Sequence, residues 1–458
     1  MTCLPFVSVI VLNYNGERFL PACLDALRVQ TYPADRFEVI VADNGSTDSS
    51  LRLLREAYPE VRVHETGGNL GFAGGNNTAI AVARGDYLVL LNNDTAPAQD
   101  WLEQLVAVAE QHPRAGIVTG RMRLFYDQLD VTLCCDHELR VFDVDTGLPL
   151  GVVQYLEGFG GWELDTSGAR FRRMHGGCGM IGVPVPHGEH ILSQPKGFTL
   201  RLRLAAQPPA TATIGSHGQT LARVHLTSEP QELCLEVPSS AAAAARPVMQ
   251  NAGSILFADG NSRDRGIIVK NNEAFYETDR DQFNAVEEVF AGCGGNMLMR
   301  RAMLDDVGLL DDDFFMYYED TDLSWRARLR GWQVLYAPNA IVRHVHCGSS
   351  KEWSPLFLFN VERNRLAMLI KNGAPRQAVG EFARYAGWTT RSMVESSAAT
   401  LLARPGARVA LSRALLSMRV VGSLIRSLPS LLRKRAHIQR TRITPQHEIE
   451  TWFHVSHD

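Results

Sequence analysis

Apolar runs and helix-like segments alternate through the first 120 residues of the chain. Continuous apolar runs rich in β-branched residues predict strands at 6–12, 37–43, 61–66 and 86–92. Each run is followed by a segment with helical spacing, at 16–30, 46–59, 71–85 and 98–112. Strands that are apolar on both faces and separated by helices predict an α/β fold, with a mostly parallel sheet covered by helices on both faces.

The pattern changes near residue 128. Helical spacing fades, and apolar and polar residues alternate at 198–204, 221–226 and 232–237, which is typical of short strands in a β-sandwich. The alanine-rich stretch 238–247 is expected to be a linker, and the α/β pattern returns after it. We therefore predict two halves of one α/β domain at 1–127 and 249–372, an inserted β-sandwich-like domain at 128–248, and a C-terminal helical region at 373–458.

The C-terminal region is strongly basic. Segment 375–443 carries thirteen Arg or Lys residues, and its acidic residues are Glu381 and Glu395. One interpretation is a set of helices packed on the core with solvated basic faces. The other is binding to an anionic membrane surface.

Composition excludes several classes of protein. The formal net charge of −4 argues against a chain-wide nucleic-acid surface, so no nucleic-acid partner is expected. The eight cysteines are scattered without metal-binding spacing, which predicts reduced thiols and a cytoplasmic protein. The N-terminus lacks the basic start of a signal peptide. No stretch reaches 18 consecutive apolar residues, so no membrane-spanning helix is expected.

Polar side chains follow all four predicted N-terminal strands. They lie at Asn13–Asn15, Asp43–Asn44, Glu65–Asn69 and Asn92–Asp94. In open α/β sheets, ligands bind beyond the carboxyl ends of the strands. Magnesium or manganese often takes one or two carboxylates together with substrate phosphates, so Asp94 with Asn92 nearby is a candidate metal site. A turn capped by Asn or Asp side chains is the structural alternative.

A second acidic cluster, "YYEDTDLSWR", begins a predicted helix at residue 319. A carboxylate at a helix start beside another acid can be tuned to act as a base. Asp322 and Arg326 are four residues apart and can pair across one turn. A capped surface helix would account for that pair but not for the Tyr-Tyr-Glu-Asp sequence. His344 and His346 point the same way on a predicted strand, although such histidines are more often structural than ligands.

Five segments in this order resemble a known family. They are "VSVIVLNYNG", "VADNGSTDSS", "GGNLGFAGGNN", "LLNNDT" and "YYEDTDLSWRARLRGW". Together they are similar to the inverting glycosyltransferases of family 2, which have the GT-A fold, and most similar to the bacterial rhamnosyltransferase branch. The resemblance covers roughly 5–125 and 250–370 and omits the insert. It implies that 1–127 binds the nucleotide sugar and that 249–372 supplies the acceptor side and the catalytic base.

The resemblance also implies a role for individual residues. Asp94 would bind a divalent cation, magnesium or manganese, although the family's first carboxylate is here Asn92. His344, or failing it His346, would complete the metal or diphosphate site. The catalytic base would be Asp320, with Glu319 and Asp322 as local alternatives. The donor-binding residues would be Asn13, Asn15, Asp43, Asn69, Gly71 and Asn92. The acceptor side would include Gly294, Gly295, Asn296, Trp325 and Arg326. Trp325 would be either an acceptor platform or a core residue.

The expected function is inverting transfer of a sugar to a cell-surface glycan or lipid-linked acceptor. The expected donor is dTDP-rhamnose, and a UDP donor of galactofuranose or another hexose is the alternative. A non-catalytic glycan-binding assembly protein is a second alternative. A nucleotidyltransferase is disfavoured, because "NYNGERF" lacks that class's Gly-rich basic loop. Within the insert, Trp162, Phe171 and Arg173 could form a sugar platform or a sandwich core. The expected location is the cytoplasm, with possible peripheral attachment at the inner face of the membrane.

Overall fold

A mixed sheet forms the centre of the molecule. The computed structural model describes residues 4–186, 196–271, 273–345, 353–404 and 406–454. The parallel strands β1, β2, β3 and β4 lie in the order β4-β1-β2-β3, and β22 joins β4 to β6 while running antiparallel to both. These strands are β1 (Val7–Asn13), β2 (Phe37–Asp43), β3 (Arg62–Glu65), β4 (Tyr87–Asn92), β6 (Ala115–Cys135) and β22 (Asn296–Arg300).

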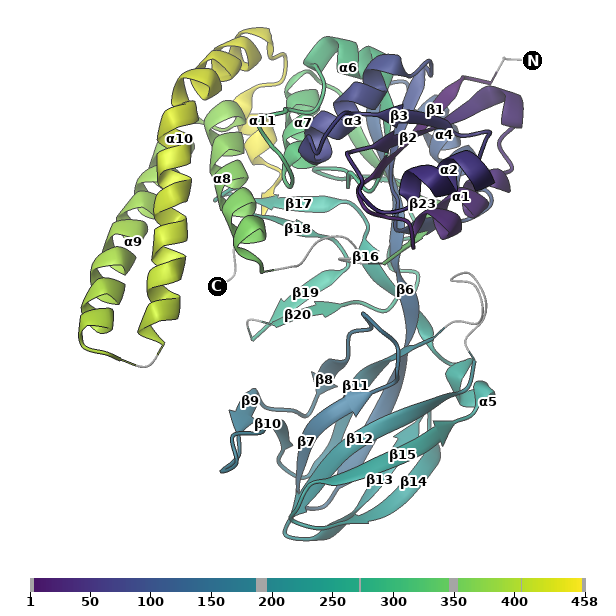
Figure 1. Cartoon of the computed structure of the whole chain (residues 1–458), viewed down its shortest axis with the longest axis vertical. Coiled ribbons are helices and arrows are strands. Elements are labelled where there is room, and N and C mark those ends of the chain that lie inside the picture. Colours follow the sequence, from purple (N-terminus) through teal and green to yellow (C-terminus); the bar gives the residue numbers. More distant parts are fainter. Residues whose placement is uncertain (1–3, 187–195, 272, 346–352, 405, 455–458) are drawn as a thin grey trace.

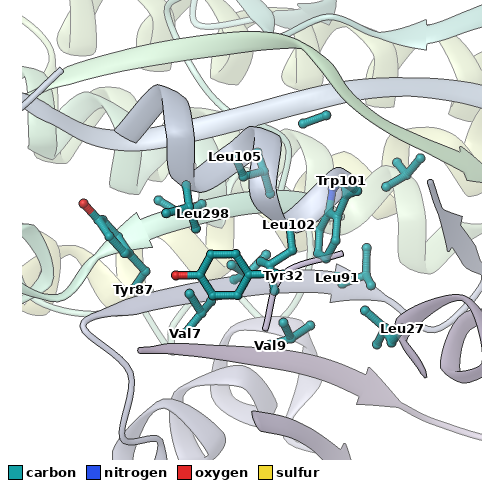
Figure 2. Close-up of a cluster of buried hydrophobic side chains, with 14 of the residues drawn as sticks. Val7, Val9, Leu27, Tyr32, Tyr87, Leu91, Trp101, Leu102, Leu105 and Leu298 are labelled. Atoms are coloured by element: carbon teal, nitrogen blue, oxygen red, sulfur yellow. The ribbon is translucent and has the colours of Figure 1, made fainter. Parts of the chain in front are cut away.

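Helices cover both faces of this sheet, as predicted. One face packs against α1 (Leu20–Arg28), α2 (Ser50–Ala57) and α4 (Trp101–Gln111). The other packs against α3 (Gly71–Val82), α6 (Arg301–Val307) and α7 (Glu319–Leu329). Successive residues of a strand point to opposite faces, so Val9 enters the first cluster and Ile10 the second. Figure 2 shows the first cluster, where Trp101 and Leu102 pack over Val9.

The inserted region is β-rich, also as predicted. β6 continues from the central sheet into it, where it pairs with β11 (Gly177–Val185) and β13 (Ala210–Ser216) (Figure 1). β8 (Gln154–Glu157) and β14 (Gln219–Leu226) extend this sheet. A second sheet contains β15 (Gln231–Val237), β12 (Phe198–Gln207), β7 (Glu138–Asp145), β10 (Arg170–Met174) and β9 (Trp162–Leu164). Both sheets contribute to one buried cluster, which is the arrangement of a β-sandwich.

Two expectations about the insert are wrong. The alanine-rich stretch is not a free linker, because it forms α5 (Ser239–Ala242) and buries Ala241 and Ala242 in the sandwich core. The thiols are not all reduced, because Cys134 and Cys178 form a disulfide. These two cysteines are 44 positions apart in sequence, but the antiparallel pairing of β6 with β11 places them directly opposite each other.

Short elements connect the insert to the second half of the α/β domain. β16 (Arg246–Asn251) returns beside β6, and β23 (Gln333–His344) pairs with both β6 and β5 (Thr95–Pro97). The remaining elements are η1 (Ala34–Arg36), β17 (Ser254–Phe257), β18 (Ser262–Asp264), β19 (Ile267–Lys270), β20 (Glu273–Tyr276), β21 (Glu287–Glu288) and β24 (Phe453–His454).

The C-terminal region is helical, as predicted. It consists of α8 (Pro355–Asn372), α9 (Pro375–Leu401), α10 (Ala407–Thr441) and α11 (Gln446–Glu450). Trp325 of α7 shares a buried cluster with residues of α8 and α10, and Lys434 of α10 lies 2.6 Å from Asp313, so the helices are attached to the α/β domain. By length and composition alone, α10 is apolar enough to cross a membrane.

Candidate active site

The carboxyl ends of β1, β2 and β4 bring three polar side chains into one buried network. The strand register sets Asn13 beside Asp43 and Leu12 beside Asn92. The Asn13 amide donates to Asp43 Oδ2 at 3.1 Å, and Asn93 donates to Asn13 Oδ1 at 2.8 Å. Parallel strands end at the same edge of a sheet, which is why residues 30 to 80 positions apart meet here.

The loop after β2 joins the same network. Asp43 Oδ1 accepts from the backbone N–H of Ser46 at 2.9 Å, and Asn15 Oδ1 accepts from that of Thr47 at 2.7 Å. Asn15 adopts a positive φ of 51°, which an Asn side chain tolerates better than most. Asp43 is 2% exposed, but a carboxylate has about four acceptor positions, so it can still accept from a ligand.

Asn44 organises the start of α3, a role that the sequence analysis did not assign. Its amide donates to Asn69 Oδ1 at 3.2 Å and to the carbonyl of Gly71 at 3.0 Å. Gly71 has a φ of +74°, and a Cβ at this position would lie 2.2 Å from the carbonyl oxygen of Phe315. The N–H of Phe72 donates to that same oxygen at 2.6 Å. The predicted donor loop therefore packs directly against the segment that precedes the acidic motif.

Asp94 and His344 form the candidate metal site. His344 Nε2 lies 3.0 Å from Asp94 Oδ1 and 3.4 Å from the Asn92 amide nitrogen. Both ionisable side chains are largely buried. They meet because β23 runs antiparallel to β5 and pairs His344 with Thr95, the neighbour of Asp94. Gln250, which the sequence analysis missed, accepts from His344 Nδ1 at 2.7 Å.

This donor set fits a hard divalent cation that takes further ligands from outside the chain. Among the residues that the structure describes, no group of three or more His, Cys, Asp or Glu side chains gathers as a metal cluster. One carboxylate and one imidazole are nevertheless suitable ligands for magnesium or manganese when a diphosphate supplies additional oxygens. His346, the other candidate, lies outside the described residues.

Two glycines connect this site to the second acidic cluster. The N–H of Asn92 donates to the carbonyl of Gly295 at 3.2 Å, and the N–H of Gly294 donates to Asp320 Oδ2 at 2.9 Å. A Cβ at Gly295 would lie 2.9 Å from the Asn92 amide nitrogen, so a larger residue there would force the Asn92 side chain to move. Asn92 and Asp320 therefore hydrogen-bond to adjacent residues, Gly295 and Gly294, and the two predicted halves of the site lie side by side.

The Tyr-Tyr-Glu-Asp sequence has a backbone explanation. Tyr317 and Tyr318 both have a φ of 70°, a conformation that costs energy for bulky residues. Two hydrogen bonds of 2.8 Å from the Asn364 amide to the carbonyls of Met316 and Tyr317 hold this turn. This backbone turn leads directly into α7, which begins at Glu319. The first helical turn of α7 therefore contains Glu319, Asp320 and Asp322.

Burial makes both acids harder to ionise. Burial raises the pKa of the Asp320 carboxyl, and hydrogen bonds from Gly294 and Thr321 act in the opposite direction. Burial, followed by the charge of Asp320, raises the pKa of Glu319 well above its ordinary value. Glu319 Oε2 is buried without a hydrogen-bond partner in the part of the chain described. We therefore expect a neutral Glu319 beside an ionisable Asp320.

The structure confirms the pairing of Asp322 with Arg326 across one turn and the core alternative for Trp325. Asp322 is 0% exposed and accepts from Arg326 Nε at 2.9 Å and from Lys371 Nζ at 2.9 Å. Burial alone would raise the Asp322 pKa, but Lys371 and Arg326 outweigh it and lower the pKa. Trp325 is also 0% exposed and packs against Phe290. These side chains stabilise the core and are closed to an acceptor.

Asn296 lies in the core, and Phe171 of the insert follows the sandwich-core alternative. Asn296 is fully buried and accepts from Trp101 Nε1 at 2.8 Å, so it is a core residue and not an acceptor contact. Phe171 is buried in the sandwich core, while Arg173 pairs with Glu163 at 2.7 Å. Trp162 is partly exposed, but two arginines stack on it. The three insert residues therefore form no common sugar platform.

Comparisons with known proteins match both halves of this site. Residues 8–136 match the family model Glycosyl transferase family 2, and residues 272–367 match Glycosyltransferase like family 2. Each matched segment covers less than a third of the chain. The matched segments contain the Asp43 and Asp94 loops in the first case and the Asp320 and His344 segments in the second. Neither segment extends through 137–271, which includes most of the insert.

Individual relatives match less than a quarter of the chain. Glycosyltransferase AglE of Haloferax volcanii is 38% identical over 107 residues, which is 23% of this chain and 35% of that protein. A poly(ribitol-phosphate) beta-glucosyltransferase of Bacillus spizizenii is 38% identical over 92 residues, 19% of this chain and 14% of the relative. The chain thus spans about a third or less of the length of these curated relatives.

Solved structures resemble larger parts of the chain at lower identity. One is a mannosyltransferase from Pyrobaculum calidifontis in complex with GDP-Man and Mn2+, with a TM-score of 0.40, 14% identity and coverage of 92% of this chain and 87% of that chain. GalNAc-T7 with UDP, GalNAc and Mn2+ has a TM-score of 0.44 and 12% identity, with coverage of 81% and 48% respectively.

Proposed function

We propose that the protein is an inverting glycosyltransferase that transfers a sugar from a nucleotide donor to a glycan or lipid-linked acceptor. The observation that carries the proposal is the connection from Asp94 and His344, through Asn92, Gly295 and Gly294, to Asp320. A cation ligand and a buried base at one edge of the sheet are what an inverting displacement requires. The family 2 domains at both segments agree with it.

Asp320 is the catalytic base in this proposal. It takes the proton of the acceptor hydroxyl while that oxygen forms a bond to the anomeric carbon. The bond from that carbon to the diphosphate breaks on the opposite face of the sugar, and the diphosphate leaves with the electron pair. A carboxylate whose pKa is raised by burial is a stronger base near neutral pH. Glu319 is the local alternative, but its more strongly raised pKa favours a neutral role.

Asp94 and His344 would hold the divalent cation, with the Asn92 amide beside them. The cation supplies charge that offsets the departing diphosphate. Asn13, Asn15 and Asp43 would hold the nucleotide, because a carboxylate accepts well from a base N–H or a ribose hydroxyl. Asn69 and Gly71 would shape the wall next to it, and the glycine allows close approach of the backbone.

The finer assignment of the donor is dTDP-rhamnose, with a UDP-linked galactofuranose or other hexose as the competitor. A thermal-shift screen of nucleotide sugars with and without manganese tests this, because a ligand that binds only the folded state raises stability. We expect one donor to stabilise the protein and manganese to increase the shift. Stabilisation by no nucleotide sugar would reject the donor site.

A non-catalytic glycan-binding protein is the second candidate, and the amide at position 92 is the observation in its favour. The two proposals differ in turnover. The transferase releases nucleoside diphosphate from its donor in a metal-dependent manner, and release is lost in Asp94→Ala and Asp320→Asn. The binding protein retains glycan affinity after chelation and turns over no donor. Full activity in both variants would show that the site is assigned incorrectly.

A further inference from the structure

Helix α10 leaves a row of apolar side chains in contact with solvent. The row consists of Leu415, Met418, Ile425, Leu428 and Leu432, all of which are exposed. Their intervals of three, four and seven residues place them on one face of the helix. Only 22% of the most apolar part of α10 is buried in the protein. A row of this length needs an explanation, because scattered exposed apolar residues are normal but contiguous ones mark interaction sites.

Helix α9 contributes to the same apolar surface. Val379 and Phe382 of α9 line a cavity of about 300 Å³ together with Ile425, Leu428 and Leu432 of α10. The two helices lie side by side and project as a hairpin away from the central sheet (Figure 1). The surface therefore continues from one helix to the other and stands apart from the candidate active site.

Arginines border this surface. Arg419, Arg426 and Arg433 each follow a member of the row by one position, which places them about 100° around the helix. All three are exposed, and none forms an ion pair or hydrogen bond within the described part of the chain. The next residue, Lys434, differs because it pairs with Asp313 at 2.6 Å. These three arginines and the apolar row together complement a surface with anionic headgroups above an apolar layer.

Two other occupants fit less well. A membrane-spanning α10 would bury Arg419 and Arg426 in the hydrocarbon at roughly 2.5–3.5 kcal/mol each, and it would have to leave its packing against α8 and α9. A second copy of the chain docked on the same row would bring the arginine borders of both copies close together, and like charges repel.

We propose that the α9–α10 hairpin docks on the surface of a bilayer that contains anionic phospholipid. The apolar row enters the boundary between headgroups and acyl chains, and the three arginines bind lipid phosphates. This geometry lays α10 parallel to the membrane plane. The proposal does not depend on the transferase activity.

Vesicle sedimentation of the full chain tests the proposal. We expect binding to vesicles of phosphatidylcholine with about a third phosphatidylglycerol, and weak binding to phosphatidylcholine alone. The triple variant Arg419→Gln, Arg426→Gln, Arg433→Gln is expected to bind the anionic vesicles on the order of 100-fold more weakly, at about 1 kcal/mol per arginine. Arg203→Gln, Arg223→Gln, Arg246→Gln, in the insert, removes the same charge from exposed positions and is expected to bind normally.

The apolar contribution has its own variants. Ile425→Ser with Leu432→Ser is expected to reduce vesicle binding at least tenfold, whereas Leu164→Ser with Val269→Ser, exposed elsewhere, leaves it unchanged. All these positions are exposed, so unfolding midpoints should stay close to that of the parent chain. Equal binding to both vesicle types would overturn the proposal, as would loss of binding in either control. Lipid-independent dimerisation that the row variants abolish would assign the surface to a second copy instead.

Discussion

The imidazole of His344 lies between Asp94 and Gln250. Its Nε2 is 3.0 Å from Asp94 Oδ1, and its Nδ1 is 2.7 Å from Gln250 Oε1. The amide oxygen of Gln250 can only accept, so Nδ1 carries a hydrogen. This contact orients the ring and turns Nε2 towards Asp94 Oδ1. In the proposed metal site, that nitrogen and the carboxylate would bind the cation together.

Gln250 is expected to control metal affinity by orienting that ring. Gln250→Leu removes the acceptor at Nδ1 and should weaken manganese binding by about 10- to 100-fold, the usual effect of losing such a supporting contact. The measurement is a titration of free manganese by electron paramagnetic resonance in the absence of donor. Gln250→Glu keeps an acceptor at the same place and should restore most of the affinity. Unchanged affinity in the leucine variant would remove Gln250 from the site.

Asp320 and Asp322 are expected to fail in different ways, although they are two residues apart. Asp320→Asn keeps the shape of the carboxyl group but not its basicity, so turnover should fall by about 10²- to 10⁴-fold. Folding and donor-induced stabilisation should persist, because Asp320 makes no ion pair among the described residues. Steady-state kinetics and thermal shift on the same sample check this. Turnover within tenfold of the parent protein would assign the base elsewhere.

The Asp322 variant tests the core. Asp322→Asn leaves Arg326 without its buried counter-charge and leaves Lys371 paired with Asp311 alone. Breaking a buried pair in this way costs about 3–5 kcal/mol. We expect the free energy of unfolding, measured by urea titration, to fall by that amount. The Asp322 pKa is lowered, so its stabilising effect is present above the ordinary pKa of aspartate and disappears as the pH falls through the folded-state value. A stable Asp322→Asn protein with low turnover would return Asp322 to the catalytic candidates.

Glu319 should make folding less favourable as the pH rises. Its folded-state pKa is raised by burial and by Asp320, so the folded protein holds a proton that the unfolded chain releases above about pH 4.5, the ordinary pKa of the group. Glu319→Gln removes this penalty. The variant should therefore be more stable than the parent chain at neutral pH, and the difference should vanish near pH 4. Urea titrations at both pH values provide the measurement, and a less stable variant at neutral pH would contradict it.

The sequence predicted the parts of the fold that depend on local periodicity. The apolar run before Asn92 and the helix after Glu319 have the expected positions, because each can be inferred from spacing alone. The Cys134–Cys178 disulfide was missed, since it depends on which strands pair. Spacing predicted the pairing of Asp322 with Arg326. The second partner of Asp322, Lys371, could not be predicted in this way, because it lies on a helix 49 positions away.

The candidate site shows the same limit. Asp94, His344 and Asp320 could be proposed from motif order, and the structure connects them. Gln250 could not, because no motif precedes it and its role arises only when β16 returns from the insert beside β23. Asn44 gave a weak signal as a strand-end amide, but its partners Asn69 and Gly71 come from a loop 25 to 27 positions later.

Gly71 gives a prediction that separates backbone geometry from chemistry. Gly71→Ala adds a Cβ at a φ of +74° and at 2.2 Å from the Phe315 carbonyl oxygen. A positive φ alone disfavours alanine by about 1 kcal/mol or more, and the clash must also displace either α3 or the segment before Tyr317. We expect a loss of roughly 1–3 kcal/mol in unfolding free energy and weaker donor-induced stabilisation, since both sides of the displaced contact carry candidate site residues.

Gly387→Ala is the matched control. Gly387 lies in α9 with open space where a Cβ would go, so alanine should stabilise that helix by about 0.5–1 kcal/mol. The same substitution is therefore expected to lower the free energy of unfolding at Gly71 and to raise it at Gly387. Urea titration measures both changes. A Gly71→Ala protein as stable as the parent chain, with an unchanged donor response, would show that the contact between the donor loop and the acidic segment is not needed to hold the two halves of the site together.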